Sequence, residues 1–310
     1  MEDNDALIKV EGLVIEYGSR NERFRAVDEL SFEVNKGECV GFIGANGAGK
    51  SSTIKAIMGF HFPTTGSIRV FGEEAGSARS RREIGYLPEV ALYYPFMKAR
   101  ELLELYGGLH GVSREELRKR IPGLLDRVGL GGRGESLLKQ FSKGMQQRLG
   151  IAQALISEPE LLVFDELNSG LDPIGRHDLR SVLLELKEKG RTIFFSSHEL
   201  SEVEQVCDRV IILHKGRLIR NVTVEELVQP LNRFEIRFRS EGELPSSVRE
   251  ASPVAEGDHQ KVTLNDVGSY SAVLKGLTDS GSEILETKTL QFSLEQFFIQ
   301  LVNEANGNPS

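Results

Sequence analysis

The sequence predicts an α/β protein built on a mostly parallel sheet, and two patterns carry this prediction. Three short apolar runs, at 161–164, 192–197 and 209–213, are rich in Val, Ile, Leu and Phe and are separated by helical segments. Such runs are typical of parallel strands covered on both faces, and helical crossovers join strands of that kind. In addition, a strand, a glycine-rich loop and a helix follow one another from Cys39 to Phe60.

The glycine-rich stretch CVGFIGANGAGKSS, residues 39–52, contains the pattern G-x-x-x-x-G-K-S. Its glycines let the backbone curl so that N–H groups point at an anion, and the following helix adds its positive N-terminal end. Lys50 supplies a charge for the β- and γ-phosphates of a nucleotide, and the Ser51 hydroxyl is a ligand for Mg²⁺. The alternative is an ordinary glycine-rich turn, which the adjacent Lys and Ser disfavour.

The other elements follow in order along the chain. Alternating apolar residues predict strands at 7–14 and 29–34, and further strands are expected at 66–72 and 84–88. From about 97 to 158 the apolar spacing becomes helical. After about Arg220 the pattern changes again, and short strands, exposed loops and a final amphipathic helix indicate a small α+β region.

Composition excludes several classes of protein. The 310 residues are 39% hydrophobic and carry a net charge of -8, which gives no basic surface for nucleic acid. The two cysteines indicate neither a disulfide framework nor a metal cluster, so we expect a reducing, cytoplasmic compartment. The N-terminus lacks the features of a signal peptide, and no run of about 20 apolar residues predicts a membrane span.

A second chemical signal is LLVFDE, in which an apolar strand ends in Asp165 and Glu166. At the carboxyl end of a parallel strand, these side chains should face the same crevice as the phosphate loop. Asp165 can hold Mg²⁺, and Glu166 can orient or deprotonate an attacking water. The alternative is a pair of solvated acids at a strand end.

With these motifs in hand, residues 7–220 resemble the nucleotide-binding subunit of an ATP-binding cassette (ABC) transporter. The resemblance rests on motifs in the family's order: Tyr17, GANGAGKS, IGYLPE, FSKGMQQR, LLVFDE, SGLDP and SSH. It implies the P-loop NTPase fold of ABC ATPases, with antiparallel β and helical subdomains around the parallel core. The expected domains are 1–220, with a helical subdomain at about 90–160, and a small C-terminal α+β domain at 221–310.

The resemblance also implies a set of site residues. Tyr17 is expected to stack on adenine, although it can also be a plain strand-edge aromatic. Ser142 and Gly144 are expected to contact the γ-phosphate held by the opposite subunit, and Asp172 to link the two sites. His198 is expected to contact the γ-phosphate and Glu166 to be catalytic. The phosphate loop itself comprises Gly44, Ala45, Asn46, Gly47, Ala48, Gly49, Lys50, Ser51 and Ser52. The metal ligands are expected among Ser51, Asp165 and Glu89.

A few positions depart from the family's commonest pattern. Ala45 and Ser52 are mild changes in the phosphate loop, and Leu167 replaces the proline expected after the acidic pair. Glu89 stands where the family usually has a glutamine that contacts Mg²⁺ and water. Because glutamate also occurs there in the export branch, inactivity does not follow.

The expected function is therefore an ATP-hydrolysing subunit that requires ATP and Mg²⁺. It should form a head-to-tail homodimer around two ATP molecules and drive export through a separate integral membrane permease. Its expected place is peripheral, on the inner face of the membrane. The aromatic residues Tyr93, Tyr94 and Phe96 either pack in the helical subdomain or line a groove for the permease. Alternatives for the whole chain are an import ATPase or a nucleotide-gated module that does not act in transport.

Overall fold

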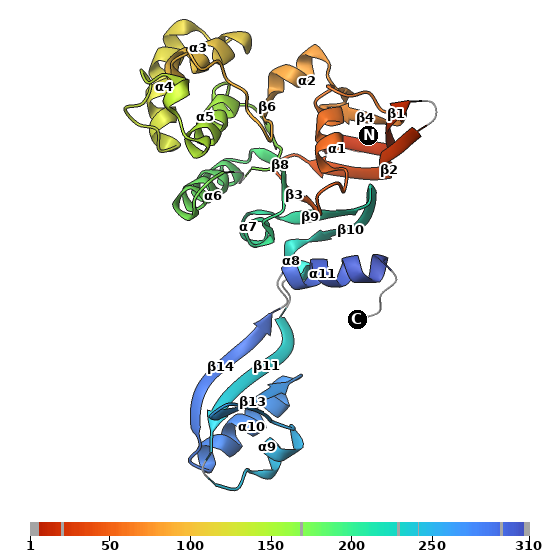
Figure 1. Cartoon of the computed structure of the whole chain (residues 1–310), viewed down its shortest axis with the longest axis vertical. Helices are drawn as coiled ribbons and strands as arrows, with labels where there is room; N and C mark the ends of the chain where they lie inside the picture. Colours follow the sequence, from red (N-terminus) through yellow and green to blue (C-terminus); the bar gives the residue numbers. More distant parts are fainter. Residues whose placement is uncertain are drawn as a thin grey trace. The chain divides into compact units, whose positions relative to one another are not determined.

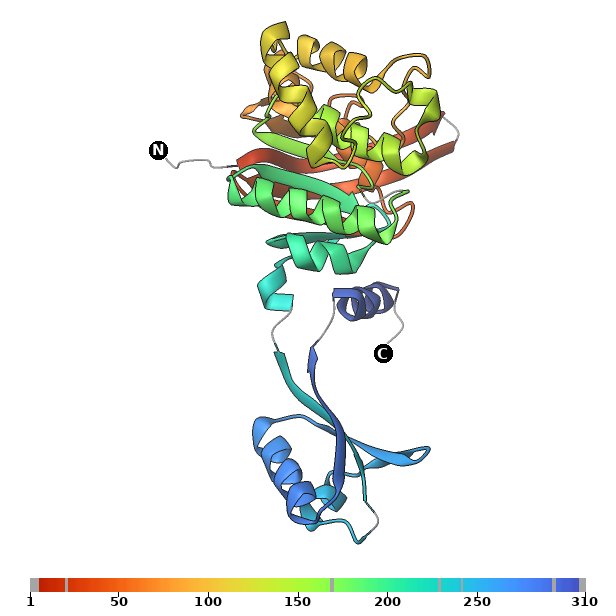
Figure 2. The same cartoon turned by 90° about the vertical axis from the view of Figure 1, so that its left-hand side faces the viewer.

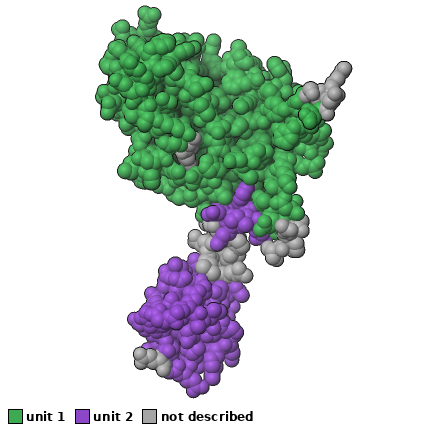
Figure 3. Space-filling model, in the orientation of Figure 1, with its two compact units in different colours: residues 1–224, 301–310 green, residues 225–300 purple. Residues whose placement is uncertain are grey.

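The computed structural model describes residues 6–19, 22–167, 170–227, 230–240, 242–291 and 294–306 (Figure 1). The chain divides into two compact units (Figure 3), which are Met1–Val224 with Leu301–Ser310, and Glu225–Gln300. The predicted domains, 1–220 and 221–310, divide the chain differently at the C-terminus. There Asn306 accepts a hydrogen bond from Lys215 Nζ at 2.9 Å, which joins the residue after α11 to the first unit.

The first unit contains an antiparallel sheet of four strands in the order β2-β1-β4-β5. Two long strands dominate it, β1 (Ala6–Ser19) and β2 (Glu22–Asn35), and both exceed the predicted lengths. The other two are β4 (Thr65–Val70) and β5 (Glu73–Glu74).

The second sheet of this unit has six strands in the order β10-β9-β3-β8-β7-β6. It comprises β3 (Cys39–Gly44), β6 (Ile84–Leu87), β7 (Leu161–Phe164), β8 (Thr192–Ser197), β9 (Arg209–His214) and β10 (Arg217–Thr223). All neighbours pair in parallel except β9 and β10. The predicted parallel core is thereby confirmed, and β3, β7 and β8 are completely buried.

Helices connect these strands. Around the sheets lie α1 (Lys50–Ile57), α2 (Ala78–Glu83), α6 (Pro173–Glu188) and α7 (Leu200–Val206). A helical segment contains α3 (Ala99–Leu109), α4 (Arg114–Arg127), the short 3-10 helix Leu138–Gln140 and α5 (Lys143–Leu155). In the part of the chain that the structure describes, no helix is both long and apolar enough to cross a membrane.

The two sheets share one apolar core, which fixes the strand that precedes the phosphate loop. Phe32 of β2, Phe42 of β3 and Phe194 of β8 meet there. The ring centroids of Phe32 and Phe42 are 5.5 Å apart, and those of Phe42 and Phe194 are 5.1 Å apart. Deep burial of three aromatic side chains holds β3 rigidly, so the loop that follows it starts from a fixed position.

The second unit has a different architecture. Its elements are β11 (Pro230–Arg239), α9 (Ser246–Glu250), β12 (Val254–Glu256), β13 (His259–Leu264), α10 (Val267–Asp279) and β14 (Glu283–Gln291). The antiparallel order β12-β13-β11-β14 gives the split βαβ, ferredoxin-like connectivity. Figure 2 shows α10 along one face of this sheet, where Ile236, Phe238 and Leu277 form a small core. The unit also contains most of α8 (Val224–Leu227) and the first part of α11 (Leu294–Ala305).

Candidate functional site

The phosphate loop joins β3 to α1 through glycines in the left-handed region of φ. Gly47 has φ of 79° and Gly49 has φ of 101°. A Cβ atom on Gly49 would lie 2.5 Å from the carbonyl oxygen of Ala26, so no other residue fits there. Gly49 is also the N-cap of α1 and offers no side-chain cap. The first N–H groups of α1 are therefore available to an anion.

Lys50 is the buried cation of this loop. Its side chain is 5% exposed, and Nζ donates a hydrogen bond to the carbonyl oxygen of Gly44 at 2.8 Å. The same Nζ lies 3.3 Å from Glu166 Oε1. The structure thus brings the lysine of the glycine loop and the carboxylate of the LLVFDE motif together, across 116 positions of sequence (166 minus 50).

Asp165 follows β7 and lies under the start of α1. Its Oδ1 accepts hydrogen bonds from Ser51 Oγ at 3.1 Å and from Ser196 Oγ at 2.8 Å. Burial raises the pKa of Asp165 above its ordinary value, while the two hydroxyl bonds act in the opposite direction. Since burial disfavours the charged form, a cation beside Asp165 and Ser51 would stabilise the carboxylate.

Glu166 has a backbone conformation that is uncommon for a residue with a side chain, with φ of 53°. Its N–H donates to Ser196 Oγ at 2.8 Å, which holds the turn after β7. Its Oε2 lies 2.6 Å from Nδ1 of His198, which follows β8. Because β7 and β8 are parallel neighbours, their carboxyl ends place Glu166 and His198 side by side.

Lys50, Glu166 and His198 open into one hollow of about 440 Å³. Its lining includes Tyr17, Glu89, Glu166 and His198 together with residues 46–52 of the phosphate loop. Tyr17 donates from its hydroxyl to Ser52 Oγ at 3.1 Å. Gly44 and Ala45 do not line the hollow, but their carbonyl oxygens face Lys50 Nζ, at 2.8 and 3.5 Å.

Sequence reasoning missed two residues of this lining, Phe24 and Ala26. Phe24 is 64% exposed and pairs in register with Tyr17 across β1 and β2. Directly opposite residues of an antiparallel pair share a face, so the register places Phe24 beside Tyr17. The stretch GSRNERFR, residues 18–25, contains a single apolar side chain, so residue types alone do not reveal this pairing register.

Besides Gly44, Ala45 and Asp165, three further predicted site residues do not line this hollow. Ser142 is the N-cap of α5 and accepts from the Met145 N–H at 3.2 Å. Asp172 is the N-cap of α6 and accepts from the Gly175 N–H at 2.8 Å. A Cβ on Gly144 would lie 3.0 Å from the carbonyl oxygen of Gly170. Within the described part of a single chain, these residues serve helix starts and are not gathered with Lys50.

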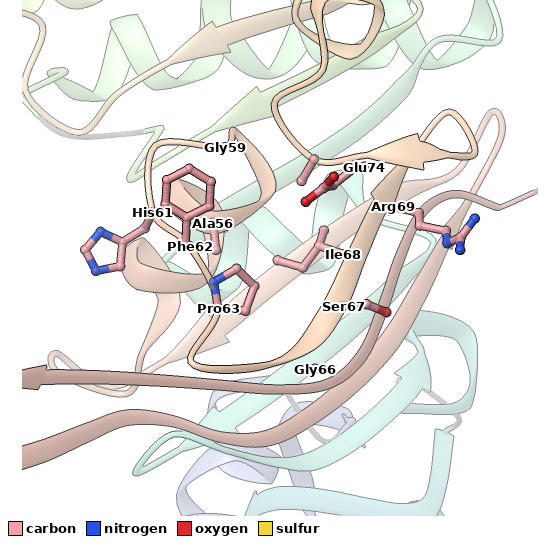
Figure 4. Close-up of a pocket in the computed structure, with 11 residues that line it drawn as sticks. Ala56, Gly59, His61, Phe62, Pro63, Gly66, Ser67, Ile68, Arg69 and Glu74 are labelled. Atoms are coloured by element: carbon pink, nitrogen blue, oxygen red, sulfur yellow. The ribbon is translucent and has the colours of Figure 1, made fainter.

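A second hollow, of about 550 Å³, lies between α1 and the β4–β5 strands. Figure 4 shows His61, Phe62 and Pro63 on one side of it and Arg69 on the far side. The His61 ring points away from Ile68 and Pro63 and packs against Tyr17, with centroids 4.8 Å apart. No residue of the phosphate loop lines this hollow, so the two hollows are separate. They are connected only indirectly, because His61 in the wall of the second hollow packs against Tyr17 in the wall of the first.

Comparison with known proteins identifies the family. Residues 27–169 match the model of the family described as "ABC transporter". An uncharacterised ABC transporter ATP-binding protein of Synechocystis sp. is 35% identical over 92% of this chain and 80% of its own length. The bacitracin transport ATP-binding protein BcrA of Bacillus licheniformis is 34% identical over 96% of this chain and 97% of its own length.

Solved structures agree with this result. A structure described as the ATP-binding subunit of an ABC transporter is 36% identical, with a TM-score of 0.66, and covers 71% of this chain and 91% of its own. A dimeric ATP-binding cassette in a post-hydrolysis state with ADP and Pi is 25% identical, with a TM-score of 0.66, and covers 70% of this chain and 98% of its own. The chain therefore belongs to the ATP-binding proteins of ABC transporters and is the ATPase subunit of such a transporter.

Proposed function

We propose that the hollow around the phosphate loop holds ATP with Mg²⁺ and that Glu166 and His198 carry out hydrolysis. One observation supports this most strongly: Lys50, Glu166 and His198 form a connected chain of polar side chains at the N-terminus of α1. The N–H groups of residues 46–51 bind the phosphates, and Lys50 turns from Glu166 towards the β- and γ-phosphates. Tyr17 stacks on the adenine, with Phe24 beside it.

The donor set at the end of β7 suits Mg²⁺. Ser51 and Asp165 offer oxygen atoms, Glu89 lines the same hollow, and Mg²⁺ prefers oxygen ligands from one or two carboxylates together with phosphates. When bound, Mg²⁺ neutralises charge on the β- and γ-phosphates. Asp165 then stays deprotonated despite its burial, because a cation offsets the cost of desolvating the carboxylate.

Glu166 is proposed as the group that orients water for attack on the γ-phosphate. Its two oxygens are engaged in the structure, Oε1 by Lys50 and Oε2 by His198. Binding of the γ-phosphate draws Lys50 away and frees Oε1, while the His198 bond keeps the carboxylate oriented. Catalytic competence is thereby linked to occupancy of the phosphate site.

A second copy is proposed to complete each site. Ser142, Gly144 and Asp172 lie outside the hollow of their own chain, and an ABC cassette of known structure is dimeric. In a head-to-tail homodimer, Ser142 and Gly144 at the start of α5 reach the γ-phosphate held by the partner. The N–H groups at this helix start suit an anion, as do those of α1.

The transport direction is proposed to be export through a separate membrane permease. Relatives at similar identity include a Nod factor export ATP-binding protein of Ralstonia nicotianae and a linearmycin resistance ATP-binding protein of Bacillus subtilis. Tyr94 and Phe96 are 60% and 72% exposed, which favours the groove for a permease segment. Tyr93 is partly buried and contacts Gln153, so it supports the subdomain instead. The proposed location is the inner membrane face, with 1–220 as the ATPase domain and 221–310 as the accessory domain.

The test is ATP turnover of the tagged protein purified from membranes, beside Glu166→Gln. We expect a multi-spanning protein to co-purify and Glu166→Gln to lower turnover by about 10²- to 10⁴-fold while ATP still binds. The matched control is Glu160→Gln, which should keep turnover. Glu160 is half-buried, directly precedes β7 and lies 2.6 Å from Lys36 Nζ. Unchanged turnover in Glu166→Gln would contradict the catalytic assignment, and elution without a membrane partner would contradict the transport assignment.

A further inference from the structure

The second unit has a long strand at the edge of its sheet. In the order β12-β13-β11-β14, strand β14 has β11 as its partner on one side (Figure 1). Within the described residues no other strand pairs with it. Its nine residues, Glu283–Gln291, include no proline. Such an edge presents backbone N–H and C=O groups that can accept a strand from another chain.

We propose that β14 pairs antiparallel with β14 of a second copy, about a two-fold axis at Thr287. In the joined sheet, the α10 helices of both copies lie on the same side. The face of β14 that is turned towards α10 must therefore lie on that side in both strands. Directly opposite residues in an antiparallel pair share a face. The two-fold axis therefore lies where a residue faces its own copy, and not where it faces the copy of the next residue. Thr287 is the midpoint of β14.

The charges of the strand select this register from its neighbours. An axis at Glu286 places Glu opposite Glu, and an axis at Lys288 places Lys opposite Lys. An axis at Thr287 places Glu286 opposite Lys288 twice, and opposite charges at facing positions stabilise a sheet. Glu286 and Lys288 already lie on one face of the strand, with Nζ and Oε1 2.8 Å apart.

The proposed contact between the two β14 strands is short, so we expect it to form only when the two copies are already held together. The register with β11 skips Leu285, so regular pairing starts at Glu286. In addition, residues 225–300 contain 13 acidic and 7 basic side chains, so two copies repel each other at a distance. The strand pair therefore needs the copies to be held together, which the proposed ATP-bound dimer does by raising the effective concentration. In this respect the inference rests on the proposed function.

The test is disulfide formation in the full-length protein carrying Thr287→Cys. At the axis, the two Cα atoms of residue 287 are about 4.5 to 5.5 Å apart, within the range that a disulfide spans. The native Cys39 and Cys207 are buried and do not compete. The matched control is Thr263→Cys, an exposed threonine on β13, which is an inner strand of the same sheet.

Both variants are made in a Glu166→Gln background and oxidised mildly with ATP, and without ATP at high protein concentration. We expect Thr287→Cys to give at least about tenfold more linked dimer than Thr263→Cys, and more with ATP than without. If light scattering shows the ATP-dependent dimer but the two cysteines link equally, the strand pairing is wrong and the proposed function stands. If no ATP-dependent dimer forms, the proposed function fails, and equal linkage at high concentration then overturns the pairing as well.

A second variant tests the register. Lys288→Glu, added to Thr287→Cys, places two carboxylates opposite Glu286 of the facing strands. We expect linkage to slow by roughly 2- to 30-fold, since two favourable pairs become unfavourable, whereas Lys288→Arg should retain it. Equal linkage by the Glu and Arg variants would overturn the register centred on Thr287.

Discussion

The two units of this chain use charge in opposite ways. In the first unit, Lys50 and Asp165 are 5% and 2% exposed and converge with Glu166 at the carboxyl ends of parallel strands. In the second unit, Arg239 pairs with Asp258 and Glu283 while its own side chain stays 45% exposed. Buried charges are costly to desolvate, and a bound ligand or metal of opposite charge offsets this cost. Exposed ion pairs cost little to desolvate and contribute little to the stability of the fold.

The largest expected effect comes from Lys50→Met. This change removes the buried charge at the phosphate loop and keeps an apolar stem of similar length. Losing one partner of a buried, hydrogen-bonded charge costs about 3 kcal/mol or more, so ATP affinity should fall by roughly 10²-fold or more. The measurement is equilibrium binding of a fluorescent ATP analogue.

Lys55→Met is the control for that experiment, because Lys55 lies on the same helix with its side chain exposed. It should bind ATP as the unchanged protein does. Equal loss in both variants would mean that the affinity follows the overall charge of α1 and not the buried position.

Tyr17→Ala should have the next largest effect. Stacking of a base on an aromatic ring is worth about 1–3 kcal/mol, so affinity for ATP should fall about 5- to 150-fold. Tyr17→Phe retains the ring and loses only the bond to Ser52, so it should stay close to the unchanged protein. If Phe behaved like Ala, the hydroxyl bond and not stacking would be the main contribution.

Asp165→Asn tests how the buried Asp165 carboxyl group makes the stability of the first unit depend on pH. Burial raises the pKa of Asp165 in the folded chain, so the folded state holds its proton more tightly than the unfolded state does. Stability from this group is therefore present below the unfolded pKa and is lost as pH rises through the folded pKa. At neutral pH without Mg²⁺, the neutral Asn should raise the melting temperature.

The control for this prediction is the response to ligand. Mg²⁺ with ATP should raise the melting temperature of the unchanged protein, and this rise should be largely absent in Asp165→Asn. A lower melting temperature of Asp165→Asn without ligand would contradict the assignment of Asp165 as a charge whose burial is costly.

The smallest effect is expected for Arg239→Ala in the second unit. Exposed ion pairs contribute about 0 to 1 kcal/mol, so thermal unfolding measured by calorimetry should shift by only a few degrees at most. ATP turnover should not change. A large loss of turnover would mean that the second unit contributes to the chemistry, and the contrast between the two units would fail.

Residue types and spacing alone predicted the parallel core, the phosphate loop and the acidic end of β7. These features depend on local rules: a glycine loop before a helix binds anions wherever it occurs, and continuous apolar runs form covered strands. Tertiary structure decided which side chains from different strands meet, because such contacts depend on strand register and on which strands are neighbours. It placed Phe24 beside Tyr17 through the β1–β2 pairing and joined Lys50 to Glu166 through strand order.

The C-terminal region shows the same limit. The pattern after about Arg220 predicted short strands, but nothing in it indicates that β11 lies between β13 and β14 or that β14 is left at an edge. Strand order in an antiparallel sheet is set by non-local pairing and by the packing of α10 over Ile236 and Phe238. The sequence by itself therefore determined the local chemistry of this protein, and the folded sheet decided which groups can meet.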